Sequence, residues 1–137
     1  MQRASAAFFL VGLIVVGCAE PRYYPVRGVV QDESGATLKE LDGAVVEFEA
    51  VGQSVSAVGE IQPDGSFVMT SERDGDGCLP GEHRVVIGRV PVDGDRGALS
   101  VVDPKYHRLE TSELTVTVKK ERNEIPLRLK RISPNVE

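Results

Sequence analysis

The chain of 137 residues contains no Trp, only two His and few other aromatic residues, namely four Phe and three Tyr. Carbohydrate-binding modules need several aromatic rings for stacking on sugars, so this scarcity disfavours glycan binding. Two imidazoles leave few parts for a catalytic constellation, and the chain has neither a GxSxG nucleophile turn nor an HExxH zinc pair. We therefore expect a protein that is not an enzyme and carries no cofactor.

The chain also lacks a surplus of positive charge. It has 16 Lys and Arg against 21 Asp and Glu, a net charge of −5, and the acidic residues occur throughout the sequence. Nucleic-acid binding requires Lys and Arg gathered on one face, so we expect no nucleic-acid partner. A composition that is 41% hydrophobic and 27% charged is typical of a globular domain and argues against wholesale disorder.

Long hydrophobic runs are absent except at the start of the chain. About eleven apolar residues extend from Ala6 to Val16, and Arg3 supplies a positive charge before them. With a helical rise of about 1.5 Å per residue, this run covers only about half of a ~30 Å hydrocarbon layer. It therefore indicates the core of an export signal rather than a membrane span.

The end of this run carries a second signal. Residues 15–18, Val-Val-Gly-Cys, resemble the bacterial lipobox, in which small or aliphatic residues precede the Cys that receives a diacylglycerol. The resemblance implies a lipoprotein signal peptide over residues 1–17, lipid attachment at Cys18 and a lipidated tether over residues 18–25. Two or more acyl chains hold a protein durably on a membrane.

Two alternatives remain open for this segment: an ordinary cleaved signal followed by a chance Cys, and an uncleaved anchor. Ala19, rather than Asp, follows the Cys, and this favours sorting to the outer membrane where the cell has one. We expect an exported protein that is lipid-anchored to a bacterial membrane, with its domain outside the cytoplasm. Without its signal peptide the chain has 120 residues, with 15 basic against 21 acidic residues and a net charge of −6.

Beyond the tether, no stretch of ten residues shows the apolar spacing of a helix, and short runs with period two occur instead. They predict seven strands, over residues 26–30, 42–50, 54–61, 66–71, 83–90, 114–118 and 125–129. Turn residues separate the runs, so the pattern predicts an all-β, antiparallel β-sandwich domain over residues 26–131, followed by a C-terminal tail over residues 132–137. A domain of this size needs neither a disulfide nor a metal to fold.

Individual residues make this prediction more specific. QPDG and KKERN are turn sequences, and each predicts a hairpin between the strands that flank it. Phe67 and Met69 should point into the core. Pro126 has no amide hydrogen, so its strand should lie at a sheet edge or have that position facing solvent. The long connection between Val90 and Glu113 should be an Ω-type loop or a covering flap.

Taken in order, the segments VRGVV, LDGAVVEF, QPDGSFVM, DGDGCLPGEHRVVI and VDPKYHRLETSELTVTVKKERNEIPLRL resemble a known domain. This is the carboxypeptidase regulatory-like, transthyretin-like β-sandwich domain of small exported bacterial lipoproteins. The resemblance covers essentially all of the chain after the signal peptide. It implies a seven-stranded, prealbumin-like Greek-key sandwich and no reaction. Cys78 departs from the pattern, since small residues or Pro are more common before the Pro-Gly of this loop.

The remaining candidates for chemistry are weak. Asp74 and Asp76 offer oxygen ligands to a metal, but Val85 stands at the EF-hand position that requires a bidentate Glu, so we expect a solvated turn and no metal. Cys78, the odd thiol once Cys18 is lipidated, should be buried or pair with a second molecule. Tyr106 should cap an edge of the sandwich rather than serve as a ligand platform.

These observations predict a lipid-anchored, non-enzymatic module of the cell envelope with a structural or protein-interaction role. Its partners would be the membrane, through lipidated Cys18, and an envelope protein that the sequence does not identify. The alternative is a module that binds a small ligand or calcium through the loops 72–82 and 103–108.

Overall fold

The computed structural model of the chain describes residue 17 and residues 19–89 and 101–132. The predicted lipid attachment at Cys18, nearly all of the predicted signal peptide, residues 90–100 of the long connection and most of the predicted C-terminal tail lie outside the described residues.

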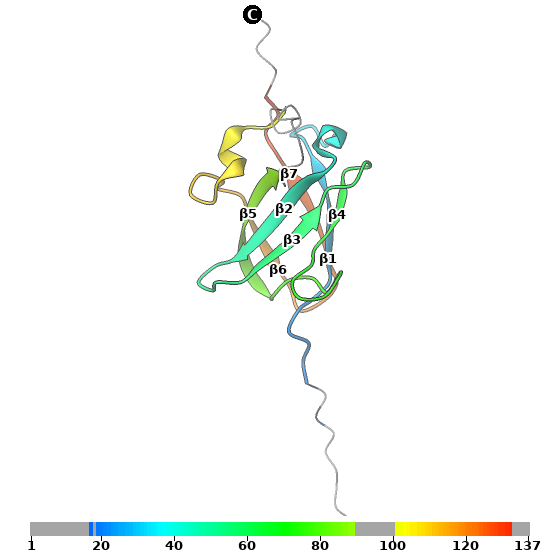
Figure 1. The fold of residues 1–137 in the computed structure, drawn as a ribbon, viewed down its shortest axis with the longest axis vertical. Helices are drawn as coiled ribbons and strands as arrows, with labels where there is room; N and C mark the ends of the chain where they lie inside the picture. Colours follow the sequence, from blue (N-terminus) through cyan, green and yellow to red (C-terminus); the bar gives the residue numbers. More distant parts are fainter. Residues whose placement is uncertain (1–16, 18, 90–100, 133–137) are drawn as a thin grey trace, which may run out of the picture.

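The described part of the chain is all-β and contains no α-helix (Figure 1). Two short 3-10 turns, η1 at Lys39–Leu41 and η3 at Pro104–His107, lie in connections. No helix in the described ranges is long and apolar enough to cross a membrane. The seven strands are β1 Val26–Gln31, β2 Ala44–Ala50, β3 Ser56–Glu60, β4 Ser66–Val68, β5 Gly81–Arg89, β6 Thr115–Val118 and β7 Asn123–Arg128.

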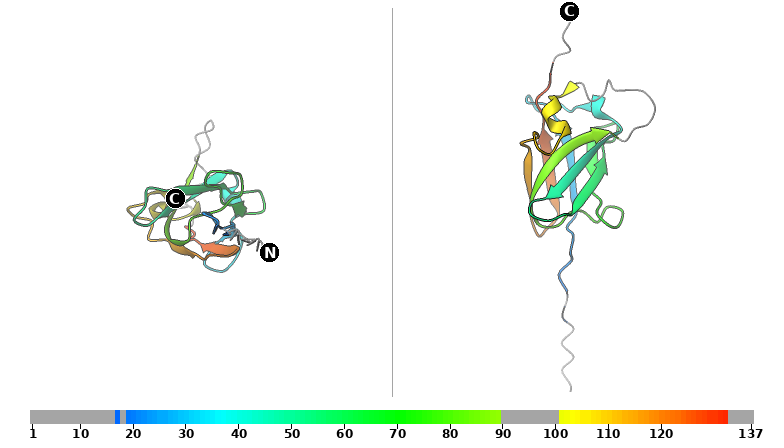
Figure 2. Two further views of the ribbon diagram at one scale, coloured as in Figure 1. Left: turned by 90° about the horizontal axis from the view of Figure 1, so that it is seen from below. Right: turned by 60° about the vertical axis from the view of Figure 1, so that its left-hand side comes forward.

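The strands form two sheets. The first sheet has the order β4-β1-β7, and the second has the order β3-β2-β5-β6. Figure 2 shows the two sheets as layers facing each other across the core. Side chains alternate between the two sides of each strand, and in β2 every second residue from Ala44 to Ala50 is buried while the residues between are partly exposed. This alternation agrees with the predicted faces.

Two phenylalanines join the layers at the centre of the core. Phe48 of β2 and Phe67 of β4 are both fully buried, and their rings meet edge to face with centroids 6.3 Å apart. Aromatic pairs in this geometry contribute about 0.5–1.5 kcal/mol beyond the burial of their area. Phe67 and Met69 point into the core as predicted.

The prediction of an entirely antiparallel sandwich is wrong for one pair of strands. β1 and β7 run parallel over six residue pairs, from Val26 opposite Asn123 to Gln31 opposite Arg128. The reason is the connection from β6, which crosses to the other sheet. β7 therefore starts at the same end of that sheet as β1, with Asn123 opposite Val26. β7 is an edge strand of its sheet, so the predicted edge position of Pro126 is confirmed.

Both predicted hairpins are also wrong, although both turns form. The QPDG turn is closed by the bond from the Gly65 N–H to the Gln62 carbonyl, at 2.8 Å. However, β3 pairs with β2 and β4 pairs with β1, so only the isolated bridge between Val58 and Thr70 joins the two flanking segments. The KKERN turn likewise connects β6 and β7, which belong to different sheets. A tight turn fixes a reversal of the chain, but it does not fix which strand each arm then pairs with.

The Phe67 ring packs directly against the backbone at Gly28, where there is no room for a side chain. A Cβ atom at this position would lie 2.0 Å from the Ile125 carbonyl oxygen and 2.5 Å from the Phe67 ring. Gly88 in β5 is the natural contrast, because a Cβ atom there would meet nothing within 4 Å.

We predict that Gly28→Ala lowers the free energy of unfolding by about 1–3 kcal/mol or more, since overpacking forces the backbone or the Phe67 ring to shift. Gly88→Ala should change it by less than about 1 kcal/mol, because this strand position can accept a side chain. Urea unfolding of both variants measures the difference. Equal midpoints for the two variants would show that the core tolerates a side chain at residue 28.

Candidate functional site

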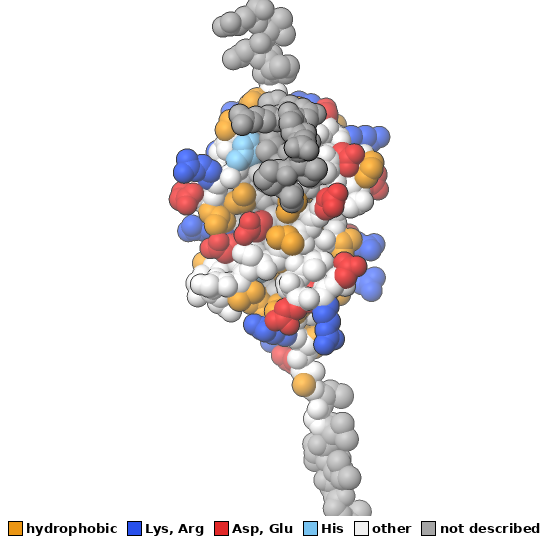
Figure 3. Space-filling model, viewed as in Figure 1, with side chains coloured by type: hydrophobic (Ala, Val, Ile, Leu, Met, Phe, Trp, Pro, Cys, Tyr) orange, Lys and Arg blue, Asp and Glu red, His pale blue; other side chains and the backbone are white. Residues whose placement is uncertain are grey.

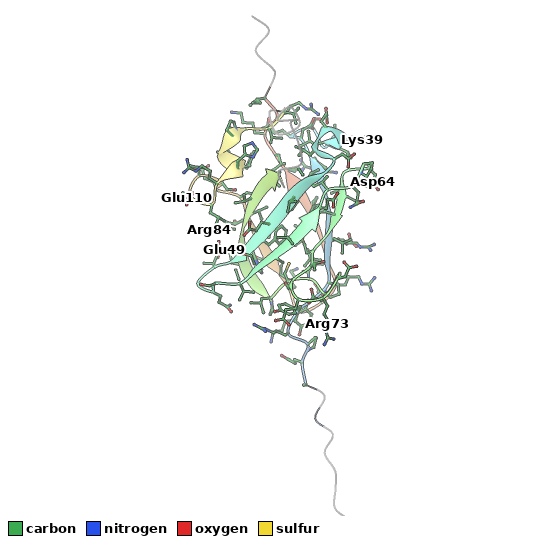
Figure 4. The ribbon with its side chains drawn as sticks, viewed as in Figure 1. Lys39, Glu49, Asp64, Arg73, Arg84 and Glu110 are labelled. Carbon is green, nitrogen blue, oxygen red and sulfur yellow. The ribbon has the colours of Figure 1, made fainter. Side chains whose placement is uncertain are left out.

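The two ends of the sandwich differ in what they carry. At one end, residues 20–25 of the tether meet the loop 70–80 and the turn 119–122, and we call this end the tether pole (Figure 1). The opposite end, the distal pole, carries η1 and η3. Figure 4 shows Arg73 beside the tether, and Lys39 and Asp64 at the other end.

The structure does not bring the loops 72–82 and 103–108 together. β5 begins at Gly81, at the tether pole, whereas the Nδ1–H of His107 donates to the Ile87 carbonyl, at 2.8 Å, near the other end of β5. Six residues of strand at about 3.3 Å each separate these two points by about 20 Å. The two loops therefore cannot line one pocket, and each has to be considered alone.

Asp76 shapes the loop at the tether pole through its carboxylate. Its two oxygens accept the backbone N–H groups of Ser71, Arg73 and Glu72, at 2.7, 2.9 and 3.1 Å. Burial raises the pKa of this carboxyl, but the three backbone donors outweigh that effect and hold the pKa below its ordinary value. In the described part of the chain, no group of three or more His, Cys, Asp and Glu side chains is arranged to hold a metal ion.

Cys78 is fully buried in the core, as one of the two predictions for it proposed. Burial, together with the nearby charge of Asp76, raises the pKa of its thiol to about 12. Its backbone pairs with that of Tyr24 through two hydrogen bonds of 2.9 and 3.0 Å. At neutral pH this residue is a buried thiol and a backbone partner of the tether.

The two histidines also bond to the backbone. His83 is 2% exposed, and its Nε2–H donates to the Leu79 carbonyl at 2.8 Å, while its Nδ1 has no partner. Its ring lies against Phe48, with centroids 6.0 Å apart. His107 is held by Ile87, as described above, so the imidazoles lie on different elements near opposite ends of β5.

Tyr106 anchors η3 to the last part of the chain, which agrees with the edge-capping role predicted for it. Its side chain is 6% exposed, and its hydroxyl oxygen accepts the N–H of Lys130 at 3.0 Å. The Asp103 carboxylate accepts the N–H of Lys105 at 3.0 Å and caps the start of η3. Tyr106 is therefore packed into the fold and presents almost none of its ring to a ligand.

One open surface was missed by the sequence prediction. The edges of β3 and β4 lie side by side without a continuous ladder and leave a shallow groove of about 600 Å³, which we call the edge seam. Val58 and Val68 stand on its two sides, each 46% exposed. The predicted hairpin would have paired these two strands, so the seam emerges only once each strand is assigned to its own sheet.

The surface around the seam mixes apolar and acidic side chains. Val45 and Glu60 contribute to its lining, and Asp74 stands at its end near the tether pole. Figure 3 shows hydrophobic and acidic side chains interspersed on the face that carries β2 and β3.

We predict that Asp76→Asn lowers the free energy of unfolding by about 1 kcal/mol at pH 7, because it removes the charge that accepts three backbone hydrogen bonds. The pKa of this carboxyl is lowered in the folded state, so the wild-type advantage is present above its unfolded value of 3.8 and is lost as the pH falls through the folded pKa.

Urea unfolding at pH 7 and pH 3 measures this effect, and the difference between the two proteins should be smaller at the lower pH. Asp74→Asn is the matched control, since the side chain of Asp74 is exposed, and it should leave the midpoint nearly unchanged. If both substitutions had the same effect, the backbone bonds to Asp76 would not be what stabilises the loop.

Comparison with protein-family models, with curated proteins and with solved structures found no match.

Proposed function

We propose that the chain is a lipid-anchored, non-enzymatic module of the bacterial cell envelope, attached through Cys18 and acting as a structural or protein-interaction unit. The predicted export signal, the resemblance of residues 15–18 to a lipobox and the two-layered β-structure formed by the described residues after the tether support this proposal. The resemblance to the carboxypeptidase regulatory-like, transthyretin-like domain points the same way, because it implies a β-sandwich and no reaction.

The proposal that the chain is not an enzyme rests on the contacts that its candidate catalytic side chains make. The Asp76 carboxylate, the His83 and His107 rings and the Tyr106 hydroxyl each bond to the backbone, and Cys78 is buried with a raised pKa. Catalysis needs a nucleophile or base that faces a substrate together with a group that positions it. The side chains that the sequence offered for this purpose instead stabilise loops and turns.

The path of the chain supports a prealbumin-like Greek-key topology. Four of the six connections cross between the sheets, namely β1 to β2, β3 to β4, β4 to β5 and β6 to β7. Strands that follow one another in sequence are therefore often in different layers, as in most β-sandwiches with Greek-key connections. Such a fold presents short edge strands and loops as its variable surfaces.

The edge seam is the surface that we propose for a protein partner. Val58 and Val68, each nearly half exposed, stand there together, and exposed apolar side chains rimmed by polar groups are typical of interaction sites. The acidic rim would favour a partner with basic groups around an apolar centre.

We predict that Cys18→Ser releases the protein from the membrane fraction and abolishes labelling by a fatty-acid analogue, since no thiol remains there to carry the lipid. Cys78→Ala is the matched control and should leave both attachment and labelling unchanged. Labelling that persists in the Cys18→Ser protein would refute the anchor.

The interaction role has a separate test. We predict that a photo-crosslinking residue at position 58 forms a discrete adduct with an envelope protein in intact cells, because Val58 stands on the seam. The same residue at position 117 is the control, since Thr117 is exposed on β6 at the opposite edge of that sheet. If neither position, or position 117 alone, gave an adduct above background, the seam would not be the interaction surface.

A further inference from the structure

We propose that the tether pole lies directly against the lipid surface, held there by a tether that is fixed to the sandwich almost from the point of lipid attachment. The proposal rests on the lipid anchor at Cys18 and adds an orientation to it: the tether pole faces the headgroups and the distal pole faces away from them.

The first attachment joins the tether to the loop 70–80. The Glu72 carboxylate accepts hydrogen bonds from the Arg22 guanidinium at 2.9 Å and from the Tyr23 hydroxyl at 2.8 Å. The Arg22 guanidinium also lies 5.2 Å from the centre of the Tyr23 ring. The bond to Glu72 raises the pKa of Tyr23, so its hydroxyl keeps its proton and remains a donor.

The second attachment uses the backbone. Tyr24 pairs with Cys78 as an isolated antiparallel bridge, and its side chain packs against the core. Gly77 makes this close approach possible, because a Cβ atom there would lie 1.7 Å from the Tyr24 carbonyl oxygen. Gly77 also has a φ of +95°, which disfavours any other residue.

The third attachment joins the tether to the turn 119–122. The ammonium of Lys120 lies 3.1 Å from the Glu20 carboxylate. The N–H of Asn123 donates to the Pro25 carbonyl at 2.8 Å, and the Asn123 side chain bonds to the backbone of Lys119 and Glu121 within the turn. The tether is therefore in contact with the sandwich from Glu20 onward, through two separate loops.

The length of chain left between lipid and sandwich is very short. Glu20 follows Cys18 by two residues, which span at most about 7 Å, and Tyr24, whose backbone bridge to Cys78 does not depend on ion pairs, follows Cys18 by six residues, which span at most about 20 Å. β1, by contrast, has six residues and a length of about 20 Å. With the Glu20–Lys120 pair formed, an acylated Cys18 at the headgroup level would keep the tether pole at the headgroups and hold the distal pole about 20 Å further out. With the Tyr24 bridge alone, the tether pole would still be the end nearer to the headgroups.

Charge does not supply this orientation, but it is compatible with it. The pole carries five basic residues and five acidic ones. These are Arg22, Arg73, Lys119, Lys120 and Arg122 against Glu20, Glu72, Asp74, Asp76 and Glu121. The tether, rather than attraction to anionic lipid, sets the distance to the membrane. The ring of Tyr23, partly exposed within the tether, suits the boundary between headgroups and acyl chains.

The test uses the full lipidated chain, reconstituted in phosphatidylcholine vesicles that contain a lipid with a nitroxide on its headgroup. Arg73→Cys and Lys39→Cys, at the two ends of the sandwich in Figure 4, each receive an environment-sensitive fluorophore. Cys78 is buried and its thiol keeps its proton at neutral pH, so the labelled wild-type protein gives the background. We expect quenching at position 73 at least threefold greater than at position 39.

A longer tether provides the matched control. Twelve Gly and Ser residues inserted between Ala19 and Glu20 leave every contact of the sandwich in place but add a flexible segment of about 20 Å. The lengthened protein should remain on the vesicles while quenching at position 73 falls toward that at position 39.

Two outcomes would overturn the proposal, and they are distinguishable. Equal quenching at the two positions in vesicle-bound protein with the natural tether would refute the orientation and leave the lipid anchor intact. Protein that does not float with the vesicles would refute the anchor and the orientation together.

Discussion

The contact between Phe67 and the strand beneath it is the constraint on which the rest of the structure depends. Phe67 comes from the short strand β4 and reaches Phe48 of the other sheet, so it is the point at which the two layers meet. This requires β1 to carry no side chain at Gly28, where a Cβ atom would meet both the Phe67 ring and the backbone of β7. Because Gly28 has no side chain, β4, β1 and β7 can pack around the Phe67 ring, which lies in the core between the two sheets.

The sequence predicted which face of each strand is buried much better than which strands are neighbours. An alternating run specifies a buried and an exposed face through the geometry of a single strand, and the buried positions of Phe48, Phe67 and Met69 follow from it. Pairing depends on packing between distant segments. Neither the departure of β4 from β3 nor the parallel pairing of β1 with β7 has a local signal.

The candidate site shows the same division. Burial of Cys78 could be predicted from the apolar character of a lone thiol, and the turn residues around Asp74 and Asp76 predicted a loop there. The sequence could not show that Asp76 would accept three backbone N–H groups, or that β5 would hold the loops 72–82 and 103–108 at opposite ends. Both facts depend on the folded path of the chain.

The contacts between the tether and the sandwich differ in strength. The stronger ones determine the direction in which the tether leaves the sandwich. The ion pairs of Arg22 with Glu72 and of Lys120 with Glu20 are at least 60% exposed, and exposed pairs contribute little and are screened by salt. The backbone bridge between Tyr24 and Cys78 depends on Gly77, whose missing side chain lets the backbone of Tyr24 approach. Cys78 itself is part of the core. Releasing the tether would therefore disturb the packing around Cys78, whereas loss of the ion pairs alone would not. The direction in which the chain leaves the sandwich is a property of the core, and it should persist at ionic strengths that abolish the surface pairs.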